Sequence, residues 1–254
     1  MGPIERRLQR ELKKWGKICL ALIDSENFTP EKASKIAKKA ENCDVAGILV
    51  GGSTALDQFH LKEVVDEIKK VVTLPVILFP NNVTGICPSA DAIFFMSLLN
   101  SENPYYIAEA QALGALLVWK YKLEAIPVGY LVVGSGGTIG FIGKVRGIPP
   151  SKPSLAAMYS LAAHYLGMRY VYLEAGSGVT SHVSSDMVRK VREFYKGNLI
   201  VGGGIRTKED AYEVTSAGAD IIVVGNLLEN EFFEKPLEEI VNVIRSVKSH
   251  DITR

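Results

Sequence analysis

The chain alternates eight short apolar runs with amphipathic segments of helical period, and this alternation restricts it to a narrow group of folds. The runs are rich in β-branched residues and stop at glycine or polar residues, as buried parallel strands do. They cover residues 18–23, 45–50, 75–79, 92–96, 127–133, 170–173, 199–201 and 221–224. Strands that alternate with helices predict a parallel sheet with right-handed crossovers.

The number of strands and the length of the chain both favour a closed barrel. The chain has 254 residues, and an α/β barrel of eight strands takes about 250. We therefore expect one (β/α)₈ barrel domain over residues 1–254. Helix starts agree with this: Thr29 can cap a helix that begins with Pro30, and Asp57 and Thr207 can cap two others.

Two places break the regular alternation. Residues 81–90 alone link the third and fourth strands, and a βαβ crossover takes at least about ten to twelve residues. We expect a barrel that is modified there by a short connection in place of a regular helix. Residues 134–150 form a long glycine-rich loop after the fifth strand. This loop lies on the ligand-binding face of such a barrel, so we expect a lid.

Three late segments carry most of the functional information, because each ends an expected strand in glycine or a polar residue; they are residues 170–178, 199–205 and 220–226. Gly203, Gly204 and Gly225 have no Cβ, so backbone N–H groups there can approach an anion closely. Helix starts beyond them add positive dipole ends, and these loops are a frequent phosphate site in barrels. We expect a phosphate-binding site; the alternative is tight turns without a ligand.

A carboxylate and a hydroxyl follow the first two expected strands. Asp24 ends the first strand and Ser53 follows the second, so both would lie at the barrel mouth. Such oxygen ligands suit Mg²⁺, which takes its other ligands from water and substrate phosphates. On spacing alone, an alternative in which Asp24 caps a loop and Ser53 caps a helix has equal weight.

Glu174 directly follows the sixth expected strand. A carboxylate there is costly inside the barrel unless it has partners or faces a ligand. Facing a ligand, it could hydrogen-bond a substrate hydroxyl and accept its proton. An ion pair at the rim is the structural alternative, but the carboxyl end of a barrel strand favours a catalytic role.

Composition and local patterns argue against several other classes of protein. Lys+Arg number 29 against Asp+Glu 28, which gives no support to nucleic-acid binding. Cys19, Cys43 and Cys87 are far apart and predict neither a zinc site nor a disulfide framework. Residues 1–17 do not form a secretory signal, and no apolar stretch approaches the length of a bilayer span. We expect a cytoplasmic protein without stable membrane insertion, for which transient membrane contact stays open.

Several motifs resemble one family over nearly the whole chain: Asp24, residues 51–53, residues 99–101 with Asn103-Pro104, the helix from Pro153, and residues 172–178, 202–205 and 224–226. The family is that of geranylgeranylglyceryl phosphate synthase, and the resemblance is to its archaeal branch. Bacterial relatives make heptaprenylglyceryl phosphate. The family has a modified barrel in which one regular helix is replaced, in agreement with the short connection expected here.

The resemblance implies a prenyltransferase that joins a geranylgeranyl group, taken from geranylgeranyl diphosphate, to the C3 hydroxyl of sn-glycerol 1-phosphate. This forms the first committed ether bond of archaeal membrane lipid biosynthesis. It implies Mg²⁺ at Asp24 and Ser53, with Glu174 as the group that orients the hydroxyl and accepts its proton. The implied glycerol-phosphate residues are Tyr172, Leu173, Glu174, Ala175, Gly176, Ser177, Gly178, Gly203, Gly204, Gly225 and Asn226. Some relatives have a lysine where this chain has Leu22, so that anion contact is not carried over.

The prenyl tail and the oligomeric state give further expectations. An apolar groove is expected over the fourth and fifth strand ends, at Phe94, Phe95, Leu98 and Tyr105. A homo-oligomer is expected from the family, with Trp119, Tyr121 and Phe141 as candidate core or interface aromatics. Alternatives are a heptaprenyl-specific synthase, another phosphate-binding or flavin-binding barrel enzyme, and a barrel without catalytic activity.

Overall fold

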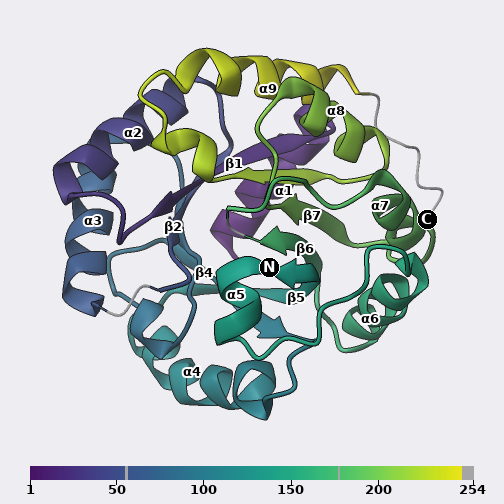
Figure 1. Ribbon diagram of the computed structural model, residues 1–254. Coiled ribbons are helices and arrows are strands. Elements are labelled where there is room, and N and C mark those ends of the chain that lie inside the picture. The colour runs from purple at the N-terminus through teal and green to yellow at the C-terminus, as the bar shows by residue number, and fades with distance from the viewer. Residues whose placement is uncertain (55–56, 177, 248–254) are drawn as a thin grey trace.

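The computed structural model describes residues 1–54, 57–176 and 178–247. Eight parallel strands close into a barrel in sequence order, which confirms the expected fold (Figure 1). The strands are β1 (Ile18–Asp24), β2 (Gly47–Gly51), β3 (Val76–Leu78), β4 (Ala92–Leu98), β5 (Glu124–Gly136), β6 (Tyr170–Gly176), β7 (Asn198–Gly202) and β8 (Ile221–Val224). Parallel pairing of β1 with β8 completes the ring, and Ile18 lies opposite Ile221.

Helices surround the barrel and begin where the sequence predicts caps. The outer ring consists of α2 (Pro30–Asn42), α3 (Gln58–Val71), α4 (Ala110–Lys120), α6 (Pro153–Tyr165), α7 (Ser185–Phe194), α8 (Lys208–Ser216) and α9 (Glu234–Ser246). The Thr29 side chain accepts a hydrogen bond from the N–H of Lys32, and Asp57 caps α3. Thr207 and Asp210 form a reciprocal capping box at α8. These side chains fix the helix starts near the barrel mouth.

The connection between β3 and β4 lacks a regular helix, as expected. Its helical content is one short 3₁₀ turn, η1 (Val83–Gly85). This turn contacts both α3 and α4, so it occupies the place that a helix would take in the ring. The side of the barrel between α3 and α4 is therefore covered by a thin segment of chain.

Side chains along each strand alternate between the barrel interior and the layer beneath the helices. In β6, Tyr170 and Tyr172 fill the interior, whereas Val171 and Leu173 pack in the outer layer. All four side chains are fully buried. Continuing this alternation puts Glu174 on the interior side, at the mouth.

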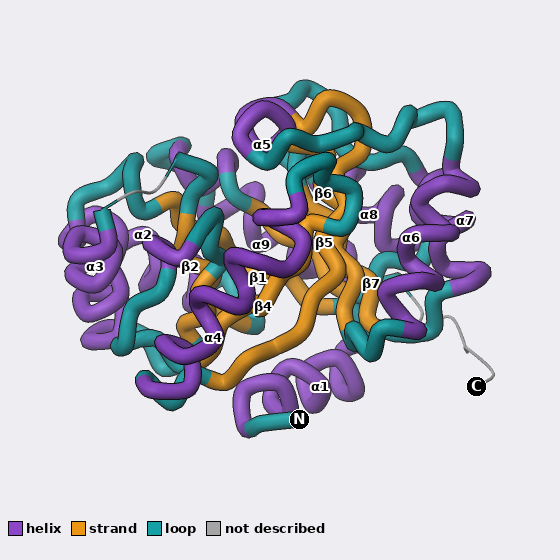
Figure 2. Tube along the Cα trace, turned by 90° about the horizontal axis from the view of Figure 1, so that it is seen from below, coloured by secondary structure: helices purple, strands orange, loops and turns teal. Residues whose placement is uncertain are grey.

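The amino-terminal end of the barrel is closed by α1 (Pro3–Trp15), which lies opposite α5 (Gly137–Ile142) in Figure 2. Leu8 of this helix is fully buried. The Glu124 carboxylate accepts hydrogen bonds of 2.6 and 2.9 Å from the N–H groups of Ile4 and Glu5. Buried Glu5 in turn accepts two hydrogen bonds, of 2.6 and 2.7 Å, from Arg169. A ligand would therefore enter from the carboxyl ends of the strands.

The segment expected as a long glycine-rich loop and lid contains a helix that the sequence did not predict. β5 continues to Gly136, and α5 follows at once and lies over the barrel mouth (Figures 1 and 2). Gly134, Gly136 and Gly137 adopt positive φ angles of 70°, 69° and 55°, which allow the sharp turn into this helix. Across the described residues, none of the helices has both the length and the apolarity of a bilayer span.

Candidate active site

A polar cavity lies at the carboxyl ends of the strands, where a ligand site was expected. Its wall combines residues from the loops after β1, β2, β6, β7 and β8. The predicted site residues in this wall are Asp24, Ser53, Tyr172, Glu174, Gly203, Gly204, Gly225 and Asn226. The structure thus brings the predicted metal residues and most of the predicted phosphate residues to one place.

Two of the predicted glycerol-phosphate residues, Leu173 and Ala175, do not face the polar cavity. The Leu173 side chain is buried in the layer between the barrel and the helices, and Ala175 packs against the same layer. Neither lines the polar cavity. Their side chains face away because β6 alternates sides with every residue. Ser177 lies outside the described residues.

The glycine turn after β7 has the close packing that only glycine permits. Gly203 and Gly204 have φ angles of 79° and 74°. A Cβ on Gly203 would lie 2.3 Å from Oε1 of Glu174, and one on Gly204 would lie 2.6 Å from the carbonyl carbon of Ser181. The Gly178 N–H donates a 3.2 Å hydrogen bond to Oδ1 of Asn226, which joins the β6 loop to the β8 loop. Glycine turns of this kind can bring backbone N–H groups close to an anion.

Glu174 is buried at the top of the barrel and held by hydrogen bonds on both carboxylate oxygens. The Gly176 N–H donates to Oε1 at 2.6 Å, and the Tyr130 hydroxyl donates to Oε2 at 3.0 Å. Burial raises the pKa of Glu174 above its ordinary value, and the hydrogen bonds from Gly176, Tyr130 and Tyr172 partly offset this rise. A fixed carboxylate with a raised pKa in a cavity has the properties of a general base.

Asp24 lies beside Gly52 at the same mouth. A Cβ on Gly52 would lie 2.2 Å from Oδ1 of Asp24, so glycine is needed for this approach. Oδ1 accepts a 3.0 Å hydrogen bond from the N–H of Glu26. Burial raises the pKa of Asp24, and the nearby charges of Glu26 and Glu229 add to the rise. A cation bound there would therefore stabilise a carboxylate that its surroundings leave uncompensated.

The donor set at Asp24 fits Mg²⁺ better than a metal held by several protein ligands. Ser53 contributes a hydroxyl to the same wall, and its carbonyl accepts a 3.1 Å hydrogen bond from Nδ2 of Asn81. Within the described ranges, no three His, Cys, Asp or Glu side chains gather into a metal-binding group. Mg²⁺ commonly binds through one or two carboxylates and completes its coordination with water and substrate phosphates.

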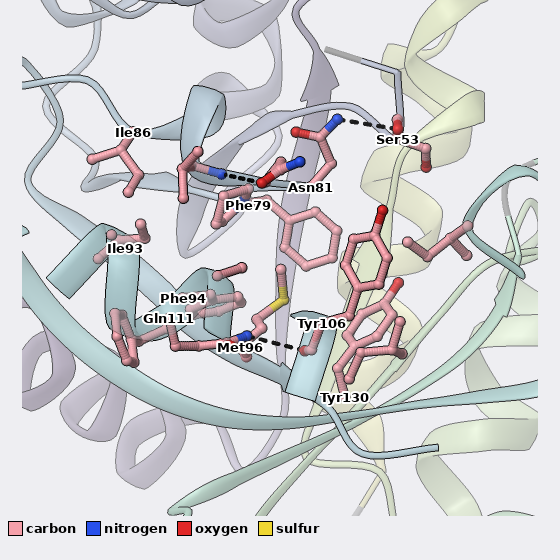
Figure 3. A pocket seen from close by; sticks show the side chains of 18 of the residues that line it. Ser53, Phe79, Asn81, Ile86, Ile93, Phe94, Met96, Tyr106, Gln111 and Tyr130 are labelled. Carbon is pink, nitrogen blue, oxygen red and sulfur yellow. Dashed lines mark hydrogen bonds between the residues drawn. The ribbon is translucent and has the colours of Figure 1, made fainter. Parts of the chain in front are cut away.

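A second, apolar cavity adjoins the first, between β4, η1 and α4 (Figure 3). Apolar side chains form most of its wall, chiefly Val83, Ile86, Ile93, Phe94, Phe95, Met96, Leu98 and Tyr106. Five residues line both cavities, namely Gly52, Ser53, Phe79, Tyr130 and Ile139. We call this shared region the junction. It is the place where an apolar ligand and a polar ligand could meet.

Three of the four residues expected in the apolar groove line the apolar cavity. Phe94, Phe95 and Leu98 line the apolar cavity, whereas Tyr105 does not. The Tyr105 hydroxyl instead donates a 2.5 Å hydrogen bond to Oδ1 of Asn82, and the neighbouring Tyr106 lines the cavity. The exchange follows from η2 (Tyr105–Glu109), a π-helical turn whose residues do not follow α-helical spacing.

Several residues of the site were not predicted from the sequence, among them Phe79, Tyr130, Ile139 and Arg206. The Phe79, Tyr130 and Tyr172 rings pack together, with centroids 4.9 to 5.9 Å apart. Ile139 reaches the junction from α5. Arg206 is the cationic side chain that the described wall of the polar cavity provides, and its Nη2 donates to the Val179 carbonyl at 2.9 Å. The sequence feature that could have revealed Arg206 is its position directly after the predicted glycine turn.

Comparison with known proteins identifies the family. The profile of the PcrB family matches residues 10–244. Geranylgeranylglyceryl phosphate synthase of Cenarchaeum symbiosum is 56% identical over 229 residues, which are 90% of this chain and 93% of that protein. The enzyme of the same name from Nitrosopumilus maritimus is 52% identical over 247 residues, covering 97% and 99% of the two chains.

A solved structure agrees with this assignment. The crystal structure of (S)-3-O-geranylgeranylglyceryl phosphate synthase from Thermoplasma acidophilum, in complex with its substrate sn-glycerol-1-phosphate, superposes with a TM-score of 0.92. It is 41% identical in sequence, and the match covers 97% of this chain and 100% of that one. The resemblance found in the sequence is confirmed. The chain belongs to the PcrB family, and its similarity to geranylgeranylglyceryl phosphate synthases extends over nearly its whole length.

Proposed function

We propose that this chain transfers the geranylgeranyl group of geranylgeranyl diphosphate to the C3 hydroxyl of sn-glycerol 1-phosphate. The observation that carries the proposal is the meeting of an apolar and a polar cavity at the junction. An isoprenoid tail and a phosphorylated polyol need two such spaces that open onto each other. The relatives' names and the substrate named for the Thermoplasma structure support this choice.

The residues suggest how the reaction proceeds. The glycerol phosphate would bind its phosphate at Gly203, Gly204, Gly225 and Asn226, which leaves its hydroxyl end toward Glu174. The bond between C1 of the prenyl group and the diphosphate oxygen breaks, and the diphosphate leaves with the bonding electrons. The C3 oxygen then bonds to C1, and Glu174 accepts the proton of that hydroxyl. Alignment of two bound substrates contributes much of the rate.

Mg²⁺ is the cofactor we propose, with Asp24 and Ser53 as its protein ligands. Bound there, it would neutralise the negative charge that develops on the departing diphosphate. The described wall of the polar cavity contains one guanidinium, that of Arg206, and three carboxylates, those of Asp24, Glu174 and Glu229. Protein cations alone therefore balance little of the charge of a diphosphate.

The direct test is transfer of radiolabelled prenyl groups to sn-glycerol 1-phosphate from farnesyl, geranylgeranyl and heptaprenyl diphosphates, with and without Mg²⁺. Ether formation that prefers the geranylgeranyl donor supports the proposal. Preference for the heptaprenyl donor would move the chain to the heptaprenyl-specific activity. No transfer from any donor would reject the synthase function, and a yellow purified protein would point to a flavin-binding barrel.

Gly114 offers a prediction about the prenyl group. It lines the apolar cavity on α4, and a Cβ there would lie 2.8 Å from Cδ1 of Ile86. We expect Gly114→Leu to block that end of the cavity and to reduce the preference for geranylgeranyl over farnesyl diphosphate by about tenfold, as the clash of a few buried carbons does. The measurement is kcat/KM for both donors. Phe59→Ala, at a residue 82% exposed on α3, is the control, and an unchanged ratio in Gly114→Leu would place the tail elsewhere.

We also propose that the chain forms a homo-oligomer through α4. Leu113, Leu116 and Trp119 follow one another at helical spacing on this helix and are 64%, 76% and 81% exposed. Tyr121 packs against the core, so of the predicted interface aromatics Trp119 and the 78% exposed Phe141 stay available. Exposed aromatic and aliphatic side chains of this kind commonly mark a protein interface.

Light scattering after size-exclusion chromatography tests this interface. We expect the native chain to elute as an oligomer and the Leu116→Lys variant to dissociate, because a buried lysine would lack a partner. Phe59→Lys, at a residue 82% exposed on α3, is the matched control. If the native chain is monomeric at micromolar concentration, the proposed homo-oligomer is contradicted.

A cytoplasmic location with transient membrane contact completes the proposed function. Cys19, Cys43 and Cys87 are buried and free, which suits a reducing compartment. The donor and the ether product both carry long apolar chains, so exchange with a membrane is needed. Cell fractionation with a soluble marker tests the location, and firm retention in washed membranes would contradict it.

A further inference from the structure

Asn100 joins three separate stretches of backbone at the end of β4. Its side chain is 2% exposed. Nδ2 donates hydrogen bonds to the carbonyls of Val132 and Arg146, at 2.9 and 3.0 Å, and Oδ1 accepts one of 3.1 Å from the N–H of Val132. The carbonyl of Asn100 also accepts from the N–H of Arg146 at 2.9 Å. One amide therefore ties the end of β5 and the segment after α5 to β4.

Ser101 fastens the same segment one residue further on. It is 8% exposed, and its hydroxyl donates a 2.6 Å hydrogen bond to the carbonyl of Gly143. Its backbone forms an antiparallel bridge with Val145. Ile148 then pairs with β5, since it exchanges hydrogen bonds with Val132 and Gly134. Both ends of α5 are thus attached to the rim of the barrel.

The attached helix, α5, is short and largely exposed at Phe141. It has only the six residues Gly137–Ile142, and Phe141 within it is 78% exposed. Its Ile139 lines both cavities and so forms part of the junction. A helix of this length is not stable alone, so the place of Ile139 depends on the attachments made at Asn100 and Ser101.

We infer that Asn100 and Ser101 are positioning residues that hold Ile139 over the junction and thereby keep water from C1 of the prenyl group. The inference rests on the proposed function. An allylic cation reacts with any nearby nucleophile, and water in an opened junction would compete with the glycerol hydroxyl. In that side reaction the bond from C1 to the diphosphate oxygen breaks and a water oxygen bonds to C1. The water proton passes to solvent, so the products are the prenyl alcohol and diphosphate.

The partition between ether and alcohol tests the inference. Asn100→Ala, Ser101→Ala and Ile139→Ala are incubated with radiolabelled geranylgeranyl diphosphate and sn-glycerol 1-phosphate, and both products are separated and counted. We expect the rate of alcohol formation per enzyme molecule to rise about tenfold in Ser101→Ala, as the loss of one buried hydrogen bond allows, and further in Asn100→Ala. Ile139→Ala shortens the side chain that covers the junction. It should also form more alcohol than the native chain, while the hydrogen bonds of Asn100 and Ser101 stay in place.

Hydrogen exchange provides the second readout. Amides of residues 143–148 should exchange faster in Asn100→Ala and Ser101→Ala, and should keep the native rate in Ile139→Ala. Ser160→Ala is the matched control, because this buried hydroxyl donates to the Ala156 carbonyl inside α6, away from the mouth. It should change neither the product ratio nor the exchange of this segment.

The outcomes separate the inference from the function on which it rests. If the native chain makes no ether from any donor, the proposed function fails. If it makes ether but the three variants form no more alcohol than the native chain, the inference is wrong, even when ether synthesis falls. Should Asn100→Ala not fold, Ser101→Ala and Ile139→Ala decide the question.

Discussion

Glu174→Gln is expected to lower kcat for ether formation by about a hundred- to ten-thousand-fold, the range that a positioned general base contributes. Glutamine has nearly the same volume and can still accept the hydrogen bond of the Gly176 N–H. It cannot take up the proton of the glycerol hydroxyl. The loss should therefore appear in kcat measured at saturating substrates, while binding of sn-glycerol 1-phosphate measured by calorimetry changes much less.

The pH profile adds a sharper test of the same role. Burial raises the pKa of Glu174, so its basic form is lost at a higher pH than that of an exposed glutamate. As the pH is lowered, activity should fall when Glu174 becomes protonated, and this fall forms the acid limb of the pH profile. Tyr130→Phe removes a hydrogen bond to the charged form, which raises the pKa further. The acid limb of kcat/KM should consequently move to higher pH.

Tyr195→Phe serves as the control for this shift. Tyr195 is equally buried, but its hydroxyl donates to the Met168 carbonyl, away from the polar cavity. Its removal should leave the acid limb in place. A Glu174→Gln enzyme that retains most of its kcat, or a profile that does not respond to Tyr130→Phe, would show that another group accepts the proton.

The fold was predictable because its signals are local in the sequence. Each strand is a continuous apolar run, since a parallel strand in a barrel is buried on both sides. Thr29, Asp57 and Thr207 mark helix starts through side chains that bond within one turn. The short link between β3 and β4 followed from its length alone. None of these inferences needed knowledge of distant contacts.

Residues of the cavity wall could be predicted where a chemically distinctive residue stands at the end of an expected strand, as for Asp24, Glu174 and Gly203. They could not be predicted where geometry across the barrel decides. Tyr130 reaches Glu174 from the neighbouring strand, and its identity as a partner depends on the register of β5 against β6. The alternation of side chains along a strand places Leu173 on the outer side of the barrel. Leu173 was nevertheless predicted as a substrate residue, because the family motif includes every residue of this segment.

The helix within the segment that covers the mouth was not predicted, for another physical reason. A six-residue helix is too short to produce a periodic pattern, and its glycines read as an open loop. What orders it is the pair Asn100 and Ser101, which lies far away in the sequence. Likewise, the sequence gives no signal for the π-helical turn that begins at Tyr105. With this turn, Tyr106 rather than Tyr105 lines the apolar cavity.

Asp24→Asn is expected to lower kcat/KM by about a thousand-fold, which corresponds to the several kcal/mol that a metal ion supplies to a charged transition state. Asparagine keeps the volume and can accept the hydrogen bond from the N–H of Glu26. It removes the charge that would attract Mg²⁺ in the polar cavity. Titration calorimetry with Mg²⁺, in the presence of diphosphate, should show weaker binding in the variant. The Ser53→Ala variant should show a smaller loss, since a neutral hydroxyl is the weaker ligand.

Glu26→Gln distinguishes a metal ligand from a general effect of negative charge at the mouth. Glu26 lies two residues away and is exposed, and its link to Asp24 is through the backbone N–H. Its carboxylate is exposed and does not bond Asp24, so its removal should leave Mg²⁺ binding nearly unchanged. If Asp24→Asn binds Mg²⁺ as well as the native chain does, the metal lies elsewhere and Asp24 serves only to shape the mouth. If both variants lose binding equally, the site senses bulk charge rather than a ligand at Asp24.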